Sequence, residues 1–296
     1  MKKLLISLSV IAVAFTACNF SKGIQTNLTT GLTYSYNGFR IEKVEVFDND
    51  MNPIKGKKHP EGTVLRIQLY NVEGYTIEDN TVFPVCSLKV TDREGKIVMQ
   101  RDNIFEGYDG DRSVENFKTP SVMIGLSNPI FAGNEYKIEV HYFDQKNPKN
   151  AIDIDLDVEV TPSESNVKYT NNGLSASEIF LSGDKSTKVP HNKFKMGSSA
   201  YIVFRGLEGF TVENGKVFPG CEVTLISKGG ETALQEDDIL QKYTDGVPAE
   251  AASMLFAGAS LNNPVEKGTY LMKVRIFDKK NATKEIKTET EIEVIE

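Results

Sequence analysis

The chain of 296 residues contains no tryptophan, only three cysteines and only three histidines. Small disulfide-built domains carry cysteine at far higher density, and antibody-type domains pack a tryptophan against a cysteine pair, so neither class fits. The histidines (His59, His141 and His191) have no cysteine or carboxylate at a zinc-ligand spacing. The sequence therefore predicts no metal site and no cofactor. Nucleophile-elbow, phosphate-loop and dinucleotide-loop signatures are also lacking, which disfavours an enzyme.

Basic residues are scarce relative to acidic ones, with 34 Lys and Arg against 41 Asp and Glu and a formal net charge of -7 at pH 7. Without a basic run, an acidic chain is a poor partner for nucleic acid, and that partner class is excluded. Long apolar runs are lacking as well. The N-terminal apolar stretch, residues 4–15, is too short for a helix that crosses a hydrocarbon core of about 30 Å.

That short apolar stretch instead suits the central part of a signal peptide, because it follows Lys2 and Lys3 and precedes small residues. The junction Phe-Thr-Ala-Cys ending at Cys18 resembles the lipobox of bacterial lipoproteins, although leucine is usual where Phe15 stands. The resemblance implies a signal peptide over residues 1–17 and a membrane anchor through lipid on Cys18. An ordinary secretory signal cut before an incidental cysteine is the alternative. We expect the polar segment 18–33 to be a flexible tether.

An internal repeat becomes visible when the chain is aligned with itself. Residues 62–86 align with 197–221 at an offset of 135, with shared Glu-Gly, Val-Phe-Pro and Cys positions. After the Asn-Pro pairs at 128–129 and 263–264 one residue is lost, and the alignment continues at an offset of 134. A register held over about 125 residues with one deletion indicates duplication of a whole domain.

Each copy reads as β-strands. Residues alternate between apolar and polar over 65–69, 136–142 and 152–160, and again over the matching segments of the second copy. Period-two alternation marks strands with one buried face, and Gly-containing turns separate them. We therefore predict an all-β chain: two tandem homologous antiparallel Ig-like β-sandwich domains after a lipoprotein signal peptide. Their predicted ranges are 34–161 and 168–296, with a linker over 162–167 that permits either a stiff rod or a hinge.

One loop in each copy is a candidate ligand-binding site. It carries a tyrosine followed by an Asp-containing turn: Tyr108, Asp109 and Asp111 in the first copy, Tyr243 and Asp245 in the second. Loops at sandwich ends commonly carry binding, so these loops are one hypothesis for a recognition surface. The other hypothesis is structural, with apolar loop residues plugging the space between the sheets and the tyrosines covering the mouth of the sandwich.

Two further sets of residues offer chemistry. Asp153, Asp155 and Asp157 lie on one predicted strand face and could supply oxygen ligands to Ca²⁺ if a neighbouring loop joined them. Their alternation with apolar residues is also typical of a solvated face, which is the preferred interpretation. Cys86 and Cys221 occupy equivalent positions of inward parity, so we expect two buried free thiols in separate cores.

The mature chain as a whole resembles lipoproteins of Bacteroidota-type bacteria built from tandem Ig-like sandwiches. The lipobox-like junction at Cys18 carries this resemblance, together with a strand-turn pattern that includes Gly-Thr-Tyr at 268–270 and Phe-Asp-Lys-Lys at 277–280. It implies a lipid-anchored protein of the cell envelope, at the outer membrane with the face undecided, and an envelope protein as partner. We expect a non-catalytic binding or structural module. The alternative is a Ca²⁺-dependent adhesin or a glycan-binding surface lipoprotein.

Overall fold

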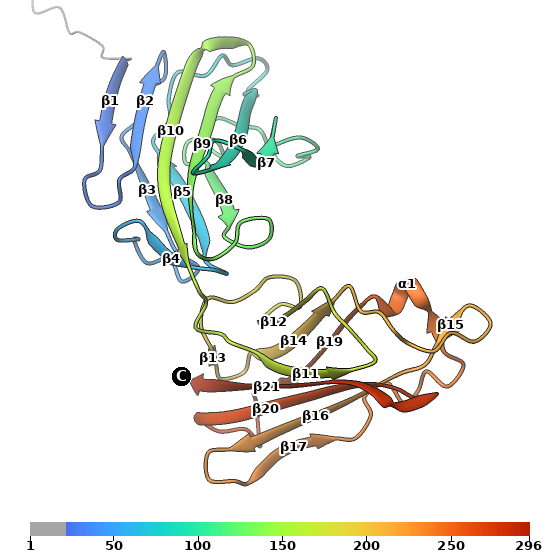
Figure 1. The fold of residues 1–296 in the computed structure, drawn as a ribbon. Coiled ribbons are helices and arrows are strands. Elements are labelled where there is room, and N and C mark those ends of the chain that lie inside the picture. Colours follow the sequence, from blue (N-terminus) through green and yellow to red (C-terminus); the bar gives the residue numbers. More distant parts are fainter. Residues whose placement is uncertain (1–21) are drawn as a thin grey trace, which may run out of the picture.

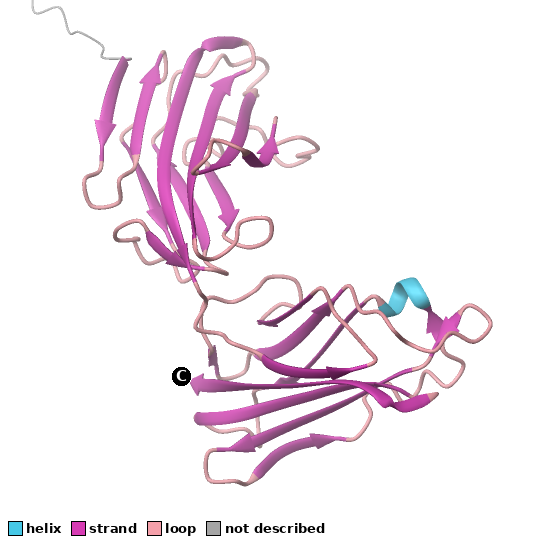
Figure 2. Ribbon diagram, in the orientation of Figure 1, coloured by secondary structure: helices cyan, strands magenta, loops and turns pink. Residues whose placement is uncertain are grey.

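A computed structural model describes residues 22–296, and nearly all of its regular structure is β-strand (Figure 2). The one helix in this part of the chain, α1 (Ala249–Ala252), has a single turn. No helix within the described residues is long and apolar enough to cross a membrane. Cys18 and the predicted signal peptide lie outside the described residues.

Repeat 1, the part of the chain from β1 to β10, contains two sheets (Figure 1). The larger sheet has the order β1-β2-β10-β9-β6-β7, with β4 paired to β10, and the smaller has the order β3-β5-β8. The strands are β1 (Lys22–Thr26), β2 (Thr33–Asn37), β3 (Lys43–Phe47), β4 (Lys58–Pro60), β5 (Val64–Tyr70), β6 (Pro84–Asp92), β7 (Ile97–Arg101), β8 (Ser121–Gly125), β9 (Asn134–Asp144) and β10 (Asn147–Thr161).

Repeat 2, the part from β11 to β21, has a similar arrangement, with no counterpart of β1 and with an additional short pair, β15–β18. Its larger sheet has the order β11-β21-β20-β16-β17, with β13 paired to β21, and the smaller has the order β12-β14-β19. The strands are β11 (Lys168–Asn172), β12 (Glu178–Ser182), β13 (Lys193–Lys195), β14 (Ser199–Arg205), β15 (Lys216–Val217), β16 (Pro219–Ser227), β17 (Thr232–Glu236), β18 (Val247–Pro248), β19 (Met254–Ser260), β20 (Gly268–Asp278) and β21 (Asn281–Ile295).

The duplication inferred from the sequence is visible strand by strand. β2 to β7 begin and end 135 residues before β11 to β14, β16 and β17, and β9 and β10 begin and end 134 residues before β20 and β21. Apart from the parallel pairs made by β4 and β13, the pairs within the larger and smaller sheets are antiparallel. The prediction of an all-β chain with two homologous antiparallel sandwiches is confirmed.

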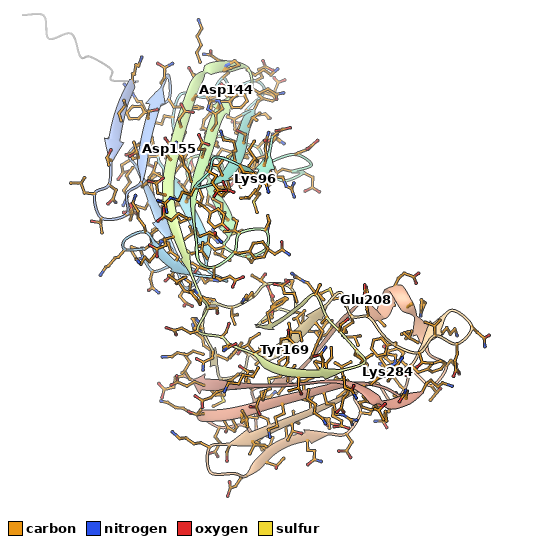
Figure 3. The ribbon with its side chains drawn as sticks, viewed as in Figure 1. Lys96, Asp144, Asp155, Tyr169, Glu208 and Lys284 are labelled. Carbon is orange, nitrogen blue, oxygen red and sulfur yellow. The ribbon has the colours of Figure 1, made fainter. Side chains whose placement is uncertain are left out.

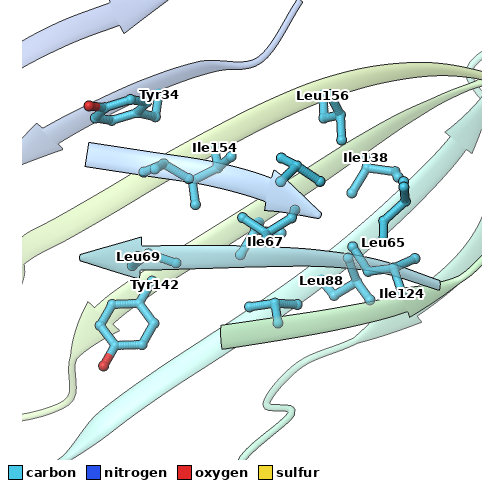
Figure 4. Packing of buried hydrophobic residues seen from close by; sticks show 14 of the residues in the cluster. Tyr34, Leu65, Ile67, Leu69, Leu88, Ile124, Ile138, Tyr142, Ile154 and Leu156 are labelled. Atoms are coloured by element: carbon cyan, nitrogen blue, oxygen red, sulfur yellow. The ribbon is translucent and has the colours of Figure 1, made fainter. Parts of the chain in front are cut away.

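A separate hydrophobic core fills each sandwich, as the alternation of residues predicts. In β10 the side chains of Ile152, Ile154 and Leu156 are buried, and the intervening aspartates are exposed. Inward side chains of β5 and β8 meet them across the sandwich, and those of β6 and β9 lie beside them on the same sheet (Figure 4). Because alternate residues of a strand face opposite sides of its sheet, the polar set is left on the outer face.

Both repeats bury one aspartate at the end of a long strand. Asp144 accepts hydrogen bonds from the backbone N–H groups of Thr76 (2.6 Å) and Lys146 (2.9 Å). Asp278 accepts the same pair of bonds from Thr211 (2.7 Å) and Lys280 (2.9 Å). Neither aspartate has any exposed surface, so these bonds stabilise the carboxylate that burial would otherwise penalise. Asp144 and Asp278 are aligned at the offset of 134, so the two repeats share this structural element.

The predicted flexible tether is partly wrong. Lys22–Thr26 forms β1 and pairs antiparallel with β2, and a loop over residues 27–32 connects the two strands. Backbone pairing drives this, because Ile24 remains 75% exposed and contributes little apolar burial. A strand that is held by hydrogen bonds rather than by apolar burial leaves no hydrophobic period in the sequence, so its composition resembles that of a linker.

Loops after β7 and β17 as a candidate functional site

Loop 1, residues 102–120 after β7, is attached to the core of repeat 1 at its first residues. Asn103 Oδ1 accepts hydrogen bonds from the backbone N–H groups of Cys86 (3.3 Å) and Phe105 (3.0 Å). Ile104 N–H donates to the carbonyl of Cys86 at 2.7 Å. The loop therefore continues the edge of the sheet past β7, and its side chains have fixed starting positions.

Tyr108 in loop 1 lies at the outer end of a chain of aromatic rings. Its ring packs edge-on against Phe117, with 5.8 Å between the ring centroids. Phe117 in turn packs edge-on against Phe105, and Phe105 against Tyr142 in the core. The Arg112 guanidinium lies 5.7 Å from the Tyr108 ring centroid, within the range of a cation–π contact. Tyr108 is 42% exposed, so one face of the ring packs inward and the other is accessible.

The two aspartates of loop 1 have different surroundings. Asp111 accepts from the backbone N–H of Ser113 (2.8 Å) and from its hydroxyl (3.0 Å), which is a local turn cap. Asp109 lies exposed beside Tyr108 in the chain. Asp111 thus shapes the loop, and Asp109 is an exposed carboxylate directly after Tyr108 in the chain.

Loop 2, residues 237–246 after β17, is attached in the same way with an added ion pair. Asp238 Oδ1 accepts from the backbone N–H groups of Cys221 (3.0 Å) and Leu240 (2.9 Å), and its Oδ2 lies 2.7 Å from Lys279 Nζ. Burial by itself raises the pKa of Asp238. The hydrogen bonds from Lys279, Cys221 and Leu240 outweigh this effect and hold the pKa below its usual range.

Tyr243 in loop 2 is also 42% exposed, and Lys242 Nζ lies 5.2 Å from its ring centroid. Asp245 has an exposed side chain, and its carbonyl accepts a hydrogen bond from Lys216 Nζ at 3.1 Å. The loop is closed by the short pair β15–β18, which α1 follows directly. Repeat 1 has one bond at the equivalent place, from Val82 N–H to the carbonyl of Arg112.

The five predicted site residues therefore form two separate surfaces. Tyr108, Asp109 and Asp111 lie in loop 1 of repeat 1, and Tyr243 and Asp245 lie in loop 2 of repeat 2. In each loop an exposed tyrosine has a cation over its ring and an exposed carboxylate close by in the chain. This combination suits contact with a partner surface, since tyrosine offers an apolar ring and a polar hydroxyl together.

The sequence-based interpretation missed the cations that accompany both tyrosines. Nothing in the sequence distinguishes Arg112 and Lys242 from other basic residues, because a cation near a tyrosine in the chain is common in surface loops. Asn103 and Asp238 did carry a signal. An Asn or Asp directly after a strand at equivalent positions of two repeats is the residue type that caps backbone N–H groups.

The aspartates considered for Ca²⁺ have basic partners. Asp153 lies 2.6 Å from His141 Nδ1, Asp155 lies 3.3 Å from Lys137 Nζ, and Asp157 lies 2.9 Å from Lys57 Nζ. Within residues 22–296 no group of three or more His, Cys, Asp or Glu side chains is placed to hold a metal ion. The acidic face of β10 is therefore exposed to solvent, with each of these aspartates beside a basic side chain of a neighbouring segment.

Cys86 and Cys221 are buried free thiols in separate cores, as predicted. Burial raises the pKa of each thiol to about 12, and Asp238 and Glu222 add to this effect at Cys221. A thiol held protonated is a poor nucleophile and a poor metal ligand. Both cysteines therefore serve as small apolar residues of the core.

No protein-family model matches the chain, and no curated protein matches it. Among solved structures, it is similar to a tetra-tandem repeat in the extending region of a large adhesion protein, with TM-score 0.24 and 10% identity over 90% of this chain and 70% of that one. It is also similar to a protein titled pT26-6p (TM-score 0.22, 10% identity, 93% and 65% covered). A third is trypsin-activated alpha-2-macroglobulin from Escherichia coli (TM-score 0.23, 11% identity, 90% and 18% covered). At such scores the likeness carries no functional assignment; the chain is described as an all-β protein of tandem repeats.

Proposed function

We propose that this chain is a non-catalytic lipoprotein of the cell envelope, held on a membrane by lipid on Cys18, whose two sandwiches act as a binding or structural module. The observation that carries the proposal is the junction between the repeats. Contacts across this junction connect the two sandwiches, and we infer that they hold the sandwiches as one unit, which is what a spacer or a two-surface binding module requires.

The linker over residues 162–167 is fixed to repeat 2 by its serines. Ser165 is 4% exposed, and its hydroxyl donates to the carbonyl of Val189 at 2.6 Å. Ser163 Oγ lies 3.1 Å from the carbonyl oxygens of Val189 and Pro190, and it accepts from the Ser165 N–H at 3.0 Å. A linker held by buried hydrogen bonds loses the freedom that its polar composition suggests.

The same segment of repeat 2 also touches repeat 1. Lys188 Nζ lies 2.8 Å from the Glu61 carboxylate, and the two side chains are 19% and 15% exposed, so water screens this pair less than a surface pair. Gly62 follows with a φ of +94°, and a Cβ at this position would lie 2.8 Å from the carbonyl oxygen of Lys188. Asp50 and His191 face each other at 3.8 Å on the rim of the junction.

Together these contacts connect the linker, one loop of repeat 2 and the turn between β4 and β5. The connection between the repeats is short. It includes the Lys188–Glu61 ion pair and the close approach of the Gly62 backbone to the backbone of Lys188. A pair of domains joined in this way keeps loop 1 and loop 2 at a set distance from each other. Two exposed tyrosine loops at fixed separation support a role in holding or spacing an envelope partner.

The first experiment tests the anchor in the native bacterium. We expect the unaltered chain to take up a labelled fatty acid and to remain with membranes after a high-salt wash. Cys18→Ala should lose both properties, and Cys86→Ala, which removes a buried thiol, should keep both. Equal distribution of the unaltered chain and Cys18→Ala between membrane and soluble fractions would contradict lipid anchoring.

The second experiment tests the module itself. The lipidated chain is captured from its own envelope in mild detergent, and the co-purifying proteins are quantified. A stoichiometric partner that is lost or displaced with Cys18→Ala supports an assembly role. Recovery of the chain alone, in repeated captures with and without crosslinking before lysis, contradicts it.

A further inference from the structure

The larger sheets of the two repeats differ at one edge, the edge at which β2 and β11 lie. In repeat 1 the strand β2 is covered by β1, whereas its counterpart β11 is the last strand of the sheet in repeat 2 (Figure 1). All five residues of β11 are exposed. The edge of β11 that faces away from β21 therefore presents backbone N–H and C=O groups that pair with no other strand within the described residues.

β1 shows how a further strand pairs with an edge of this kind. It runs antiparallel to β2 with Lys22 opposite Asn37, Ile24 opposite Ser35 and Gln25 opposite Tyr34. The Tyr34 hydroxyl donates to Gln25 Oε1 at 2.7 Å. With this cover, Tyr34 is only 4% exposed.

The counterpart of Tyr34 in repeat 2 is Tyr169, on β11, and its side chain is 57% exposed (Figure 3). Both tyrosines sit opposite an inward residue of the neighbouring long strand, Tyr34 opposite Ile154 and Tyr169 opposite Thr288. The difference in exposure therefore coincides with the presence of a covering strand in repeat 1 alone. An amide-bearing strand in the place of β1 would cover Tyr169 in the same way.

β11 of a second copy of the chain has a sequence that suits the position beside β11 that β1 takes beside β2. A second copy laid antiparallel on β11, in the register that β1 adopts on β2, puts Thr170 opposite its own counterpart. Lys168 of one copy then faces Asn172 of the other, as Lys22 faces Asn37. Asn171 faces Tyr169, as Gln25 faces Tyr34. No two like charges meet, since Lys168 is the one charged residue of β11.

We propose that β11 is a dimerisation strand through which two copies of this chain pair edge to edge, so that the larger sheets of two second repeats join into one continuous sheet. The contact is two-fold symmetric, so it closes on itself and limits the assembly to a dimer. A swapped β1 from a second copy would also fit the edge, but it must first leave β2 and expose Tyr34. This inference rests on strand register and is independent of lipid on Cys18.

The test places a cysteine on the two-fold axis of the full chain. Residues directly opposite in an antiparallel pair have Cα atoms about 4.5–5.5 Å apart, within the range that a disulfide spans. We expect Thr170→Cys to form a disulfide-linked dimer under mild oxidation. The matched control is Gln235→Cys on β17, the exposed opposite edge of the same sheet, which should form no disulfide-linked dimer.

A second variant tests the proposal without an oxidation step. Thr170→Lys places two ammonium groups opposite each other and should raise the dimer dissociation constant more than about tenfold in sedimentation velocity. Lysine at Gln235 should leave it unchanged. Crosslinking of Thr170→Cys no greater than that of Gln235→Cys, or a monomeric unaltered chain, would overturn the proposal. So would a mixed disulfide between Ile24→Cys and Thr170→Cys chains when Thr170→Cys alone forms none, because that identifies a swapped β1.

Discussion

Repeat 1 and repeat 2 share one strand plan, but they differ at an edge, at one end of the core and at the junction. Repeat 1 has a covered edge and a buried cluster of Phe39, Tyr75 and Tyr142, in which the two tyrosine hydroxyls lie 2.6 Å apart. The aligned residues of repeat 2 are Leu174, Phe210 and Ile276. Both copies keep the inward pattern of the strands, but the identities of the buried side chains differ at this end of the core.

The first and largest effect concerns the tyrosines of β2 and β11. Tyr34→Ala removes a buried ring and should lower the free energy of unfolding of repeat 1 by about 3–5 kcal/mol. Tyr169→Ala removes an exposed ring and should change that of repeat 2 by less than about 0.5 kcal/mol in dilute monomer. Hydrogen exchange measured separately on the amides of each repeat gives both values. Equal losses of unfolding free energy in the two variants would contradict the account that β1 covers Tyr34 and leaves Tyr169 without such a cover.

The second effect concerns two glycines at aligned positions, Gly62 and Gly197. Both have positive φ, +94° and +81°, so alanine should cost about 1–2 kcal/mol at either position. A Cβ on Gly62 also meets the carbonyl of Lys188, whereas a Cβ on Gly197 meets nothing within 4 Å. Gly62→Ala should therefore cost more in thermal unfolding and should loosen the junction. A larger loss for Gly197→Ala would contradict the close packing.

The third effect concerns His59, which is aligned with Phe194. His59 is 6% exposed, and its Nε2 has no hydrogen-bond partner, a state that costs about 1–3 kcal/mol. Replacing it with the residue found in the other repeat, His59→Phe, should therefore raise the stability of repeat 1 by about 1 kcal/mol in urea unfolding. A loss of stability would mean that the imidazole makes a contact that phenylalanine cannot replace.

His59 also gives repeat 1 a pH dependence with a definite sign. Burial lowers the pKa of His59, and a backbone hydrogen bond with Gly56 and the charge of Asp48 oppose this in part. As pH falls below about 6.5, the unfolded chain binds a proton that the folded chain resists, so stability falls. The difference in stability between His59→Phe and the unaltered chain should grow from pH 7 to pH 5. A constant difference would contradict the lowered pKa.

The smallest expected difference is that between Cys86 and Cys221. Because the pKa of each thiol is about 12 in the folded chain, neither should react with a thiol reagent at pH 8, and both should react in denaturant. Above about pH 9 the unfolded thiols ionise while the folded ones do not. Stability should therefore fall as pH rises from 9 towards 12, by a similar amount for each repeat. Rapid labelling of one thiol in the native chain would show that one core opens.

The sequence predicted the parts of the fold that depend on burial along a strand. Alternation at Ile152, Ile154 and Leu156 identified the inner face of β10, and the two offsets located the second copy. β1 escaped notice because its residues are held by hydrogen bonds and bury little apolar surface. The junction escaped notice because Glu61 and Lys188 lie 127 residues apart, and no local pattern connects such a pair. For the candidate loops, the exposed tyrosines were predicted, and their companion cations were not.

The central claim is that the junction holds the two repeats as one unit, and a distance distribution between them tests it most directly. Spin labels at Ile97→Cys and Thr232→Cys occupy aligned, exposed positions on β7 and β17, and the native thiols of both cores are buried. In the otherwise unaltered chain, diluted with unlabelled chain, we predict one narrow distance population, and a broader one when Lys188→Gln removes the partner of Glu61. A broad distribution before that substitution is made would contradict the account.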